Sequence, residues 1–417
     1  MSKTPQFDLL IRSVRLNENG GPVDLAIENG RVAKIGRNLV CEAVEAFDGE
    51  GKFAFPGFVE THIHLDKAGI LSRCTLCKGT LAEAVSETAK AKAEFTEEDV
   101  YARAAKVVES AIVNGTTRLR TFVEVDPRVN LRSFAAIKRI REDYAFAIDI
   151  EICAFAQEGL TNELETYELL EAALSDGADL VGGAPYVDPD PSKQIAMIFD
   201  IAKKYDVSVD FHLDFDLDPA HTDLPSVISE TVRRGYQGRV SIGHVTNLSA
   251  MGKDGVTAIA DQLQEAGIGL TVLPATDMFL NGRAFDHLIP RGVAPAHLLH
   301  ANGVRTSIAS NNILNPFTPY GDASLGRMAN FYANVAQLAR EEDIHAAFDM
   351  VSKDAAALMG QEYGIRIGGE ADIVLLDCSS PGEAVRTIAR PLAGWKGGRR
   401  SFECAKPVIL RGQRRRA

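Results

Sequence analysis

The sequence predicts an α/β protein built on a (β/α)8 TIM-like barrel, with a small β-sandwich domain made from both ends of the chain. Three observations favour this fold: eight apolar strand-like runs, helical segments such as 81–113 between them, and a repeat of roughly 30 residues. The expected strands are 53–63, 117–125, 149–157, 179–186, 207–215, 239–246, 269–275 and 305–310. An open doubly wound sheet is the alternative, but it would usually carry a glycine-rich turn after its first strand, where this chain has histidines.

The two ends of the chain differ from this middle part. The N-terminal segment alternates apolar and polar residues around Asn29-Gly30, a hairpin signature, and residues 365–410 repeat the pattern. Neither end has enough strands to close a core alone. We therefore expect a composite sandwich from 1–52 plus 365–417, and a barrel over 53–364.

The composition is that of an ordinary globular protein, since 46% of the 417 residues are hydrophobic and 24% are charged. A net charge of −12 makes nucleic acid and anionic membrane surfaces poor partners, and we interpret the basic cluster Arg411 to Arg416 as a solvated tail. No apolar run approaches the length of a membrane span, and no secretory signal opens the chain. The six cysteines are scattered, as reduced thiols are, so we expect a cytoplasmic protein.

The most informative motif is His62-Ile63-His64, at the end of the first expected strand. Side chains alternate along a strand, so the two imidazoles point to the same side, with their Cα atoms about 6–7 Å apart. Two such imidazoles make half of a metal site. The alternative is a pair of solvated or core histidines, which for an isolated H-x-H motif is the commoner case.

Polar residues also gather at the C-terminal ends of the other expected strands, where a barrel of this kind places its chemistry. They are Glu124, Asp126, Gln157, His212, Asp214, Asp216, His244, Asp277, Asn311 and Asn312. Four of the nine histidines fall at strand ends, and the other five lie in loops or helical segments. Scattered histidines would not divide in this way, so the pattern favours a metal site.

Several stretches carry a family resemblance. They are Phe58-Val-Glu-Thr-His-Ile-His-Leu-Asp66, Ala154-Phe-Ala-Gln-Glu-Gly159, Asp179-Leu-Val-Gly-Gly183, Gly235-Tyr-Gln-Gly-Arg-Val240 and Pro316-Phe-Thr-Pro-Tyr-Gly321. With the strand-end histidines and the two-ended sandwich, the chain resembles the amidohydrolase superfamily over nearly its whole length. Within that superfamily it is similar to the cytosine deaminase-like branch, and most similar there to the N-isopropylammelide isopropyl amidohydrolases.

The resemblance implies a site for one divalent metal ion, zinc or else iron or manganese. Its ligands would be His62, His64 and His212. In the family, an Asp after strand eight binds the metal and takes a proton from the attacking water, and this chain has Asn311 there. We place Asn311 in both the metal set and the catalytic set, although a neutral amide oxygen is a weak ligand and no base. Three histidines and a water still complete a tetrahedral site.

The resemblance also implies contacts to a substrate. His244 would hydrogen-bond the attacking water or polarise the substrate, and Gln157 would bind the amide edge of the substrate. We add Lys67, which could bind an anionic group, and Asn312, because both follow strand ends. A buried ion pair between Lys67 and Asp66 is the alternative for that lysine. The expected partner is a small nitrogen heterocycle or cyclic amide, and the expected assembly is a homo-oligomer.

A second departure from the family concerns the proton. Cytosine deaminases carry a Glu three residues after the strand-five histidine, and here that position is Phe215. If His212 faces the barrel mouth, strand alternation turns Asp214 the same way, so Asp214 is our first choice for the proton acceptor. Asp216 and His244 are the other candidates. Alternatively, Asp214 orients His244 or caps the next helix.

These observations predict a metal-dependent hydrolase, a deaminase or amidohydrolase. It would cleave a carbon–nitrogen bond of a small cyclic amide, amidine or N-substituted nitrogen heterocycle by attack of activated water. The alternative is a diverged non-hydrolytic enzyme or a ligand-binding protein on the same fold, because Asn311 and Phe215 replace acidic residues of the family. The four strand-end histidines favour the hydrolase.

Overall fold

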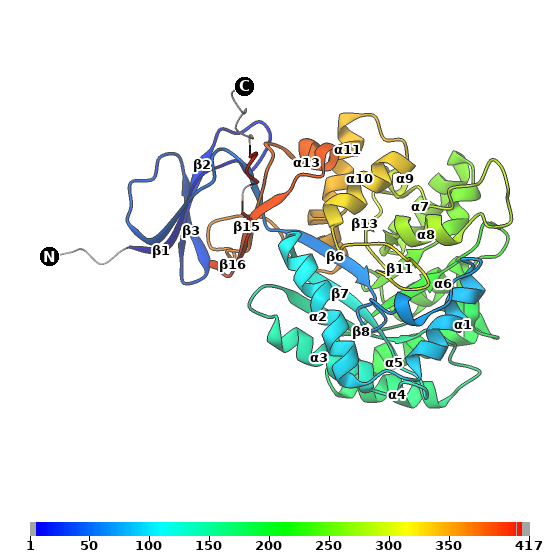
Figure 1. Ribbon diagram of the computed structural model, residues 1–417. Coiled ribbons are helices and arrows are strands. Elements are labelled where there is room, and N and C mark those ends of the chain that lie inside the picture. The colour runs from blue at the N-terminus through cyan, green and yellow to red at the C-terminus, as the bar shows by residue number, and fades with distance from the viewer. Residues whose placement is uncertain (1–5, 406, 411–417) are drawn as a thin grey trace, which may run out of the picture.

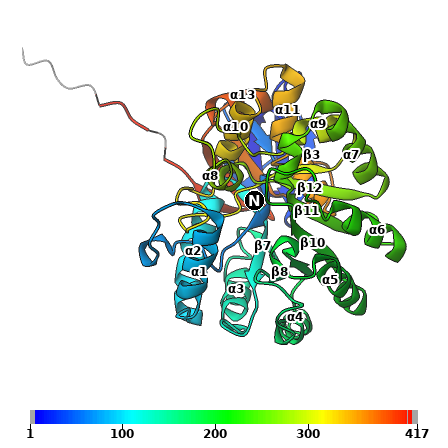
Figure 2. The same cartoon turned by 90° about the vertical axis from the view of Figure 1, so that its right-hand side faces the viewer.

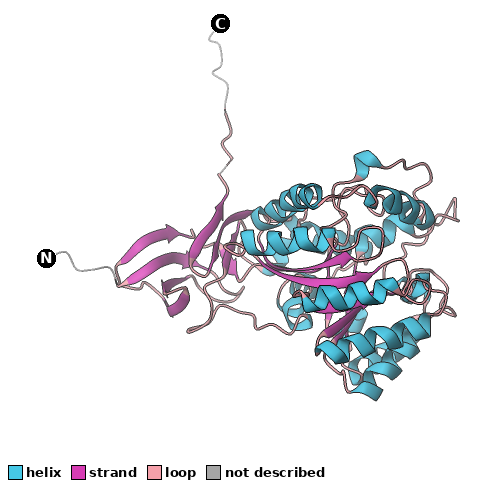
Figure 3. Ribbon diagram, turned by 90° about the horizontal axis from the view of Figure 1, so that it is seen from below, coloured by secondary structure: helices cyan, strands magenta, loops and turns pink. Residues whose placement is uncertain are grey.

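The computed structural model describes residues 6–405 and 407–410, and the basic cluster Arg411 to Arg416 lies outside them. The chain forms two parts, a barrel surrounded by helices and a smaller all-β part from which both ends of the chain emerge (Figures 1 and 3). Within the described ranges, no helix combines the length and the apolar character needed to cross a bilayer.

Eight parallel strands form the barrel, and neighbours in the sheet are also neighbours along the chain. They are β6 (Phe58–Ile63), β7 (Thr116–Glu124), β8 (Asp149–Ala156), β9 (Leu180–Gly183), β10 (Ser208–Leu213), β11 (Val240–His244), β12 (Ile268–Val272) and β13 (Thr306–Ile308). Hydrogen bonds close the sheet, because His64 N donates to the Asn311 carbonyl and Asn311 N donates to the His62 carbonyl, both at 2.8 Å. The predicted TIM-like barrel is confirmed, and its seam carries predicted site residues.

Helices surround the strands (Figure 2). They are α1 (Leu81–Lys92), α2 (Glu97–Val113), α3 (Arg132–Asp143), α4 (Glu165–Ser175), α5 (Pro191–Tyr205), α6 (Leu224–Arg234), α7 (Lys253–Glu265), α8 (Pro274–Leu280), α9 (Ala296–Ala301), α10 (Leu325–Val335), α11 (Glu341–Asp349), α12 (Lys353–Leu358) and α13 (Pro381–Thr387), with 3-10 turns η1 (Leu71–Arg73), η2 (Pro185–Val187) and η3 (Thr246–Ala250). The expected helical segment 81–113 forms two helices in the structure. The second helix, α2, begins after Thr96, whose side chain caps it by accepting a hydrogen bond from Asp99 N. The buried faces of these helices and of the strands form the main apolar core.

Two four-stranded sheets form the all-β part. The first has the order β3 (Arg31–Gly36), β2 (Val23–Glu28), β1 (Phe7–Val14), β4 (Ala43–Asp48), and the second has β16 (Arg399–Glu403), β15 (Pro391–Lys396), β14 (Ile373–Leu376), β5 (Phe53–Phe55). Side chains of both sheets, such as Ile11, Leu25 and Trp395, share one apolar cluster. Asn29 and Gly30 join β2 to β3 with φ of 51° and 73°, as the hairpin signature predicts. The sandwich built from both ends of the chain is confirmed.

The first expected strand, 53–63, is divided in the structure. β5 pairs with β14 of the sandwich, whereas β6 begins the barrel. Gly57 makes the turn between them at φ +100°, where a Cβ would lie 2.4 Å from Thr117 Cγ2. Residues 53–55, which we assigned to the barrel, therefore pair within the sandwich, and the domain boundaries stay a prediction.

Candidate metal centre and active site

Three histidines converge inside the mouth of the barrel. His62 lies near the end of β6, His64 directly follows that strand, and His212 lies near the end of β10; their exposed fractions are between 0 and 2%. The Nε2 atom of His212 lies 3.0 Å from that of His62 and 2.9 Å from that of His64. Burial first, and then nearby positive charge, lowers the pKa of each imidazole well below its usual value. Each ring is therefore neutral and keeps a lone pair for a ligand bond.

This geometry fits a divalent metal ion. A tetrahedral zinc ion with bonds of about 2.0–2.1 Å holds its ligand nitrogens roughly 3.3 Å apart, and the two distances from His212 Nε2 are within a few tenths of an ångström of that spacing. Phe122 stacks on His62 at 4.0 Å between ring centroids, and Phe155 lies 4.2 Å from His212, so aromatic rings hold the imidazoles in place. The side chains therefore suit the metal set that the sequence predicts.

Asn311 lies at the seam of the barrel beside this group. Its backbone is left-handed, with φ of 60°, and its Oδ1 is buried with no hydrogen-bond partner among the described residues. Its Nδ2 lies 3.5 Å from His244 Nε2. An amide oxygen without a partner is available to a cation, so the position suits the ligand role that we predict for Asn311.

His244 forms a pair with an acidic residue to which sequence analysis assigned no role. The Nδ1 atom of His244 lies 2.6 Å from Asp277 Oδ1, and Leu273 N donates to Asp277 Oδ2 at 3.2 Å. Asp277 comes from α8 and is fully buried. With Nδ1–H donated to this carboxylate, the Nε2 atom of His244 is the one turned toward Asn311.

The alternation argument for Asp214 is wrong. β10 ends at Leu213, and Asp214 has φ of 49°, so its side chain no longer follows the strand period. The carboxylate accepts hydrogen bonds from Thr222 Oγ1 at 2.5 Å, Asp223 N at 2.9 Å and Asn247 Nδ2 at 3.3 Å. These contacts fix the loop before α6, which is closer to the capping alternative than to a base in the pocket.

Phe215 covers His244 instead of supplying an acid. The two rings are nearly perpendicular, with centroids 4.6 Å apart. Phe215 packs with Ala84, Leu280 and Phe317 in a small apolar cluster at the mouth. This position therefore shields the imidazole from water rather than handling a proton.

Lys67 and Gln157 lie together on another wall. Lys67 Nζ donates to Glu124 Oε1 at 2.6 Å and to Gln157 Oε1 at 3.2 Å. Asp66 is not its charge partner, because the Asp66 carboxylate accepts from the backbone N atoms of Lys67 and Glu124, each at 2.9 Å. The alternative prediction, a buried ion pair between Asp66 and Lys67, is therefore wrong, because the acid that pairs with Lys67 is Glu124.

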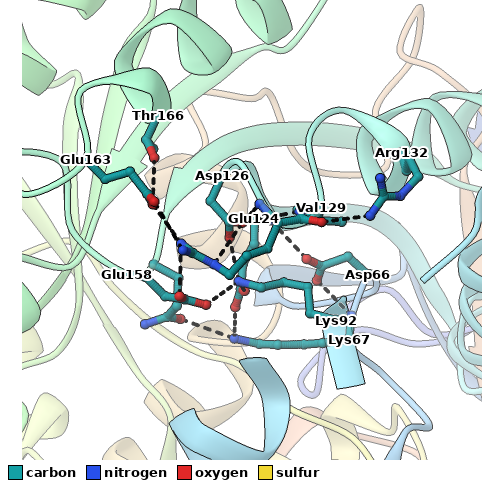
Figure 4. Close-up of polar contacts among 12 residues, drawn as sticks. Asp66, Lys67, Lys92, Glu124, Asp126, Val129, Arg132, Glu158, Glu163 and Thr166 are labelled. Atoms are coloured by element: carbon teal, nitrogen blue, oxygen red, sulfur yellow. Dashed lines mark hydrogen bonds and ion pairs between the residues drawn. The ribbon is translucent and has the colours of Figure 1, made fainter. Parts of the chain in front are cut away.

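The three carboxylates Glu124, Asp126 and Glu158 also lie close enough together to hold a metal ion. Their cation is Lys92, whose Nζ donates to all three, as Figure 4 shows. Nothing in the helical pattern of 81–113 separated this buried lysine from its solvated neighbours, so sequence analysis missed it.

These walls line one pocket at the mouth of the barrel. His64, His212, His244 and Asn311 line one part of it, and Lys67, Gln157, Asn312 and Tyr186 line the rest. Of the predicted site residues, Asp214 and the other candidate acid, Asp216, do not line this pocket.

Comparisons with known proteins identify the family of this chain. The model of the amidohydrolase family matches residues 119–402. N-isopropylammelide isopropyl amidohydrolase of Pseudomonas sp. (strain ADP) is 28% identical over 412 residues, which are 96% of this chain and 98% of the relative. Pterin deaminase of Rhizobium rhizogenes is 28% identical over a region that covers 77% of this chain and 74% of the relative.

Solved structures lead to the same group. The crystal structure of 5-methylcytosine deaminase from Klebsiella pneumoniae with 5-fluorocytosine has a TM-score of 0.91, with 27% identity over 96% of this chain and 99% of that one. The structure of N-isopropylammelide isopropylaminohydrolase from Burkholderia multivorans has a TM-score of 0.85, with 27% identity over 95% and 99% of the two chains.

Proposed function

Because this chain belongs to the amidohydrolase family and is a hydrolase of carbon–nitrogen bonds, we propose that it releases ammonia or an amine from a small nitrogen heterocycle. The observation that carries the proposal is the convergence of three neutral, buried imidazoles in one pocket with Gln157.

We infer that His62, His64 and His212 hold one divalent ion, zinc or else iron or manganese, with Asn311 Oδ1 as a further ligand. Such an ion, when bound, acts as a Lewis acid and makes water a nucleophile near neutral pH. The remaining chemistry belongs to side chains. Lys67, Gln157 and Asn312 hold the ring in the pocket.

His244 is the group best placed to move a proton. Asp277 fixes Nδ1 of the imidazole, so Nε2 can accept a proton from the attacking water and deliver it to the leaving nitrogen. Phe215 keeps bulk water away from this imidazole. Asp214, our first choice from the sequence, is the weaker candidate, because loop contacts occupy its carboxylate.

The test has two parts. Protein purified after growth with zinc, iron or manganese should contain about one equivalent of metal per chain, and less than about 0.1 equivalent would overturn the proposal. The holoenzyme should then release ammonia or an amine from a panel of amino- and alkylamino-substituted pyrimidines, triazines and pterins. Release that persists after removal of the metal by a chelator would contradict a metal-dependent reaction.

Asn311 and Phe215 keep the non-hydrolytic alternative as a second candidate. The double variant Asn311→Asp with Phe215→Glu restores the acids that the family carries at these positions. If only this variant releases ammonia, the natural chain performs a different reaction or only binds its ligand. If the natural chain is active, proton transfer does not require an acid at either of these two positions.

We also propose a cytoplasmic, homo-oligomeric enzyme with no nucleic acid or membrane partner. The cysteines are free thiols, as proteins of a reducing compartment have them. Light scattering coupled to size-exclusion chromatography would measure the mass of the assembly, and a mass equal to one chain would contradict the proposed homo-oligomer.

A further inference from the structure

The segment 407–410, Pro407-Val-Ile-Leu410, is left uncovered beside the all-β part of the molecule. Sequence analysis included it in the alternating pattern of the sandwich, yet it pairs with no strand among the described residues. Its three aliphatic side chains are 77 to 89% exposed. Figures 2 and 3 show the trace of these residues running away from the sandwich. Single exposed aliphatic residues are ordinary, but three in succession indicate a contact that one chain does not make.

The residues of this segment suit a short strand. Valine and isoleucine are enriched in strands because their branched side chains pack well on a pleated surface. Proline cannot donate a hydrogen bond, and Pro407 stands at the first position, where a strand tolerates it. In an extended conformation, Val408 and Leu410 point to one face and Ile409 to the other. The segment therefore has the composition of a strand but no sheet in its own chain.

The connection to β16 disfavours a return of the segment to its own sheet. Cys404 N donates to the Leu392 carbonyl at 2.8 Å, so pairing with β15 continues just past the end of β16. Arg390 Nη1 then donates to the Ala405 carbonyl at 3.2 Å. Tight hairpin turns need residues that adopt a positive φ, usually Gly, Asn or Asp, and residues 404–406 contain none of these. The segment is therefore more available to another chain than to its own.

β4 offers an edge that can receive such a strand. It is the last strand of the first sheet, where it pairs with β1 on one side and with no described strand on the other. Its middle is open to solvent, since Val44 is 75% exposed. The unpaired N–H and C=O groups of an edge strand are a template for a strand from another molecule.

Charge distinguishes β4 from the other edge strands. Four acidic residues lie on β4 or within two residues of it, namely Glu42, Glu45, Asp48 and Glu50. Glu45 also forms an ion pair with Arg400. The edge strands β3 and β16 are more basic, with Arg31, Lys34, Arg399 and Arg400, and the short edge strand β5 is buried. In the sequence, the segment is followed by the basic cluster Arg411 to Arg416, so charge complementarity favours β4.

A groove beside β4 can accept aliphatic side chains. Phe47 of β4 lines it together with Leu375 and Leu392 of the second sheet. Cys404 and Ala405 line the same groove. Each segment therefore leaves its own chain next to the edge that would receive the segment of a second copy. This placement allows a reciprocal exchange across a two-fold axis, in which each chain donates one strand and accepts one.

We propose that the segment 407–410 adds as a strand to the free edge of β4 in a second copy of this chain, and that the exchange is reciprocal. Main-chain hydrogen bonds hold the added strand, and its aliphatic side chains and the charges around it select this edge. The inference deepens the proposed homo-oligomer by naming its interface. It does not depend on the reaction of the barrel.

The mass of a shortened chain tests the inference. Light scattering coupled to size-exclusion chromatography should give the natural chain a mass of at least two chains, and a chain stopped after Ala405 at most half of that mass. Circular dichroism checks that the shortened chain is folded. Equal masses would overturn the inference and leave the homo-oligomer intact, whereas a natural chain with the mass of one chain would overturn both.

A point variant makes the same test without shortening the chain. Ile409→Asp places a carboxylate beside the acidic strand β4 and removes an aliphatic contact, so the mass should fall as in the shortened chain. Ile409 is 88% exposed, so the change does not disturb the fold of its own chain. The matched control is Ile367→Asp, at an isoleucine that is 65% exposed and outside the segment, and it should keep the natural mass. An unchanged mass for Ile409→Asp would contradict the inference.

Cross-linking identifies the chain that receives the segment. Neighbouring residues of paired strands have Cβ atoms about 4.5–5.5 Å apart, close enough for a disulfide after small shifts. Val44→Cys is combined in turn with Val408→Cys, Ile409→Cys or Leu410→Cys, and Val44→Cys alone gives the background of the six native cysteines. After mild oxidation, at least one double variant should run as a covalent pair of chains on a non-reducing gel. A disulfide within one chain, or no pair above background in any of the three, would overturn the exchange.

Discussion

The histidine group and the Lys92 group both lie at the mouth of the barrel, and of their ligand candidates only Glu158 is partly exposed, yet the two groups differ in chemistry. His62, His64 and His212 have converging nitrogen atoms and neutral rings. Glu124, Asp126 and Glu158 have converging oxygen atoms, but a lysine ammonium already lies among them. Close spacing of candidate ligands is common to both groups, so spacing alone does not identify a metal site.

What separates the two groups is whether each polar atom has a partner. Within the described residues, the Nε2 atoms of the three histidines have only one another as hydrogen-bond partners, so the lone pairs of these neutral rings stay open. The carboxylates of the Lys92 group are paired within the fold, and Arg128 adds further ion pairs to Asp126 and Glu158. A buried group that is already paired contributes to the structure, whereas one with open lone pairs is available to a ligand.

The largest expected effect concerns the histidine group. His212→Ala should lower the metal content below about 0.1 equivalent and the hydrolytic rate by at least about a thousandfold, because water would no longer be activated. Elemental analysis and ammonia release measure both. Glu158→Gln, in the other group, is the control and should leave the metal content unchanged. Loss of metal in the control would break the comparison.

The second prediction concerns the Lys92 group. Lys92→Met should lower the free energy of unfolding by about 3–5 kcal/mol, because it leaves buried carboxylates without their cation. Urea unfolding measures this change. Lys204→Met removes a lysine whose side chain is 58% exposed and paired with Glu171, and should change the free energy of unfolding far less. Equal costs for the two variants would contradict the structural role of Lys92.

The third prediction concerns pH. Burial alone would raise the pKa of Glu124, but the ammonium groups of Lys67 and Lys92 outweigh it and lower the pKa from 4.5 to about 2. A carboxyl with a lower pKa in the folded state stabilises the fold above its unfolded pKa, and this contribution is lost as pH falls from about 4.5 toward 2. The loss should be about 3 kcal/mol in the natural chain. Glu124→Gln should flatten this part of the profile, and an unchanged slope would contradict the assignment.

The smallest expected effect concerns the pair of His244 and Asp277. Asp277→Asn should keep the metal and lower kcat by about 10- to 100-fold, because the imidazole loses the carboxylate that fixes its orientation. Asp214→Asn is the matched comparison and should change kcat less. A larger loss of kcat from Asp214→Asn would instead support Asp214 as the proton acceptor, as the sequence analysis predicted.

The fold and most of the site could be predicted from the sequence. The period of the apolar runs located all eight barrel strands, and the H-x-H motif placed His62 and His64 on one side of β6. Both predictions depend on local rules, namely strand periodicity and the position of loops at the ends of barrel strands.

The failures lie where the backbone leaves those rules. Asp214 follows β10 with positive φ, so its side chain does not continue the alternation of that strand. Lys92 looks like any exposed helical lysine until the packing of α1 on the barrel buries it. No signal along the chain marks either event.

The sequence by itself determined a parallel barrel whose strand ends carry four histidines, because periodicity and composition act over a few residues. Only the tertiary structure decided which polar atoms meet. Asp277 reaches His244 across 33 residues, and Glu124 joins two lysines, one from the loop after β6 and one from α1. The physical reason is that a buried polar group must find a partner, and which partner lies within reach depends on how the helices and loops pack around the strand ends.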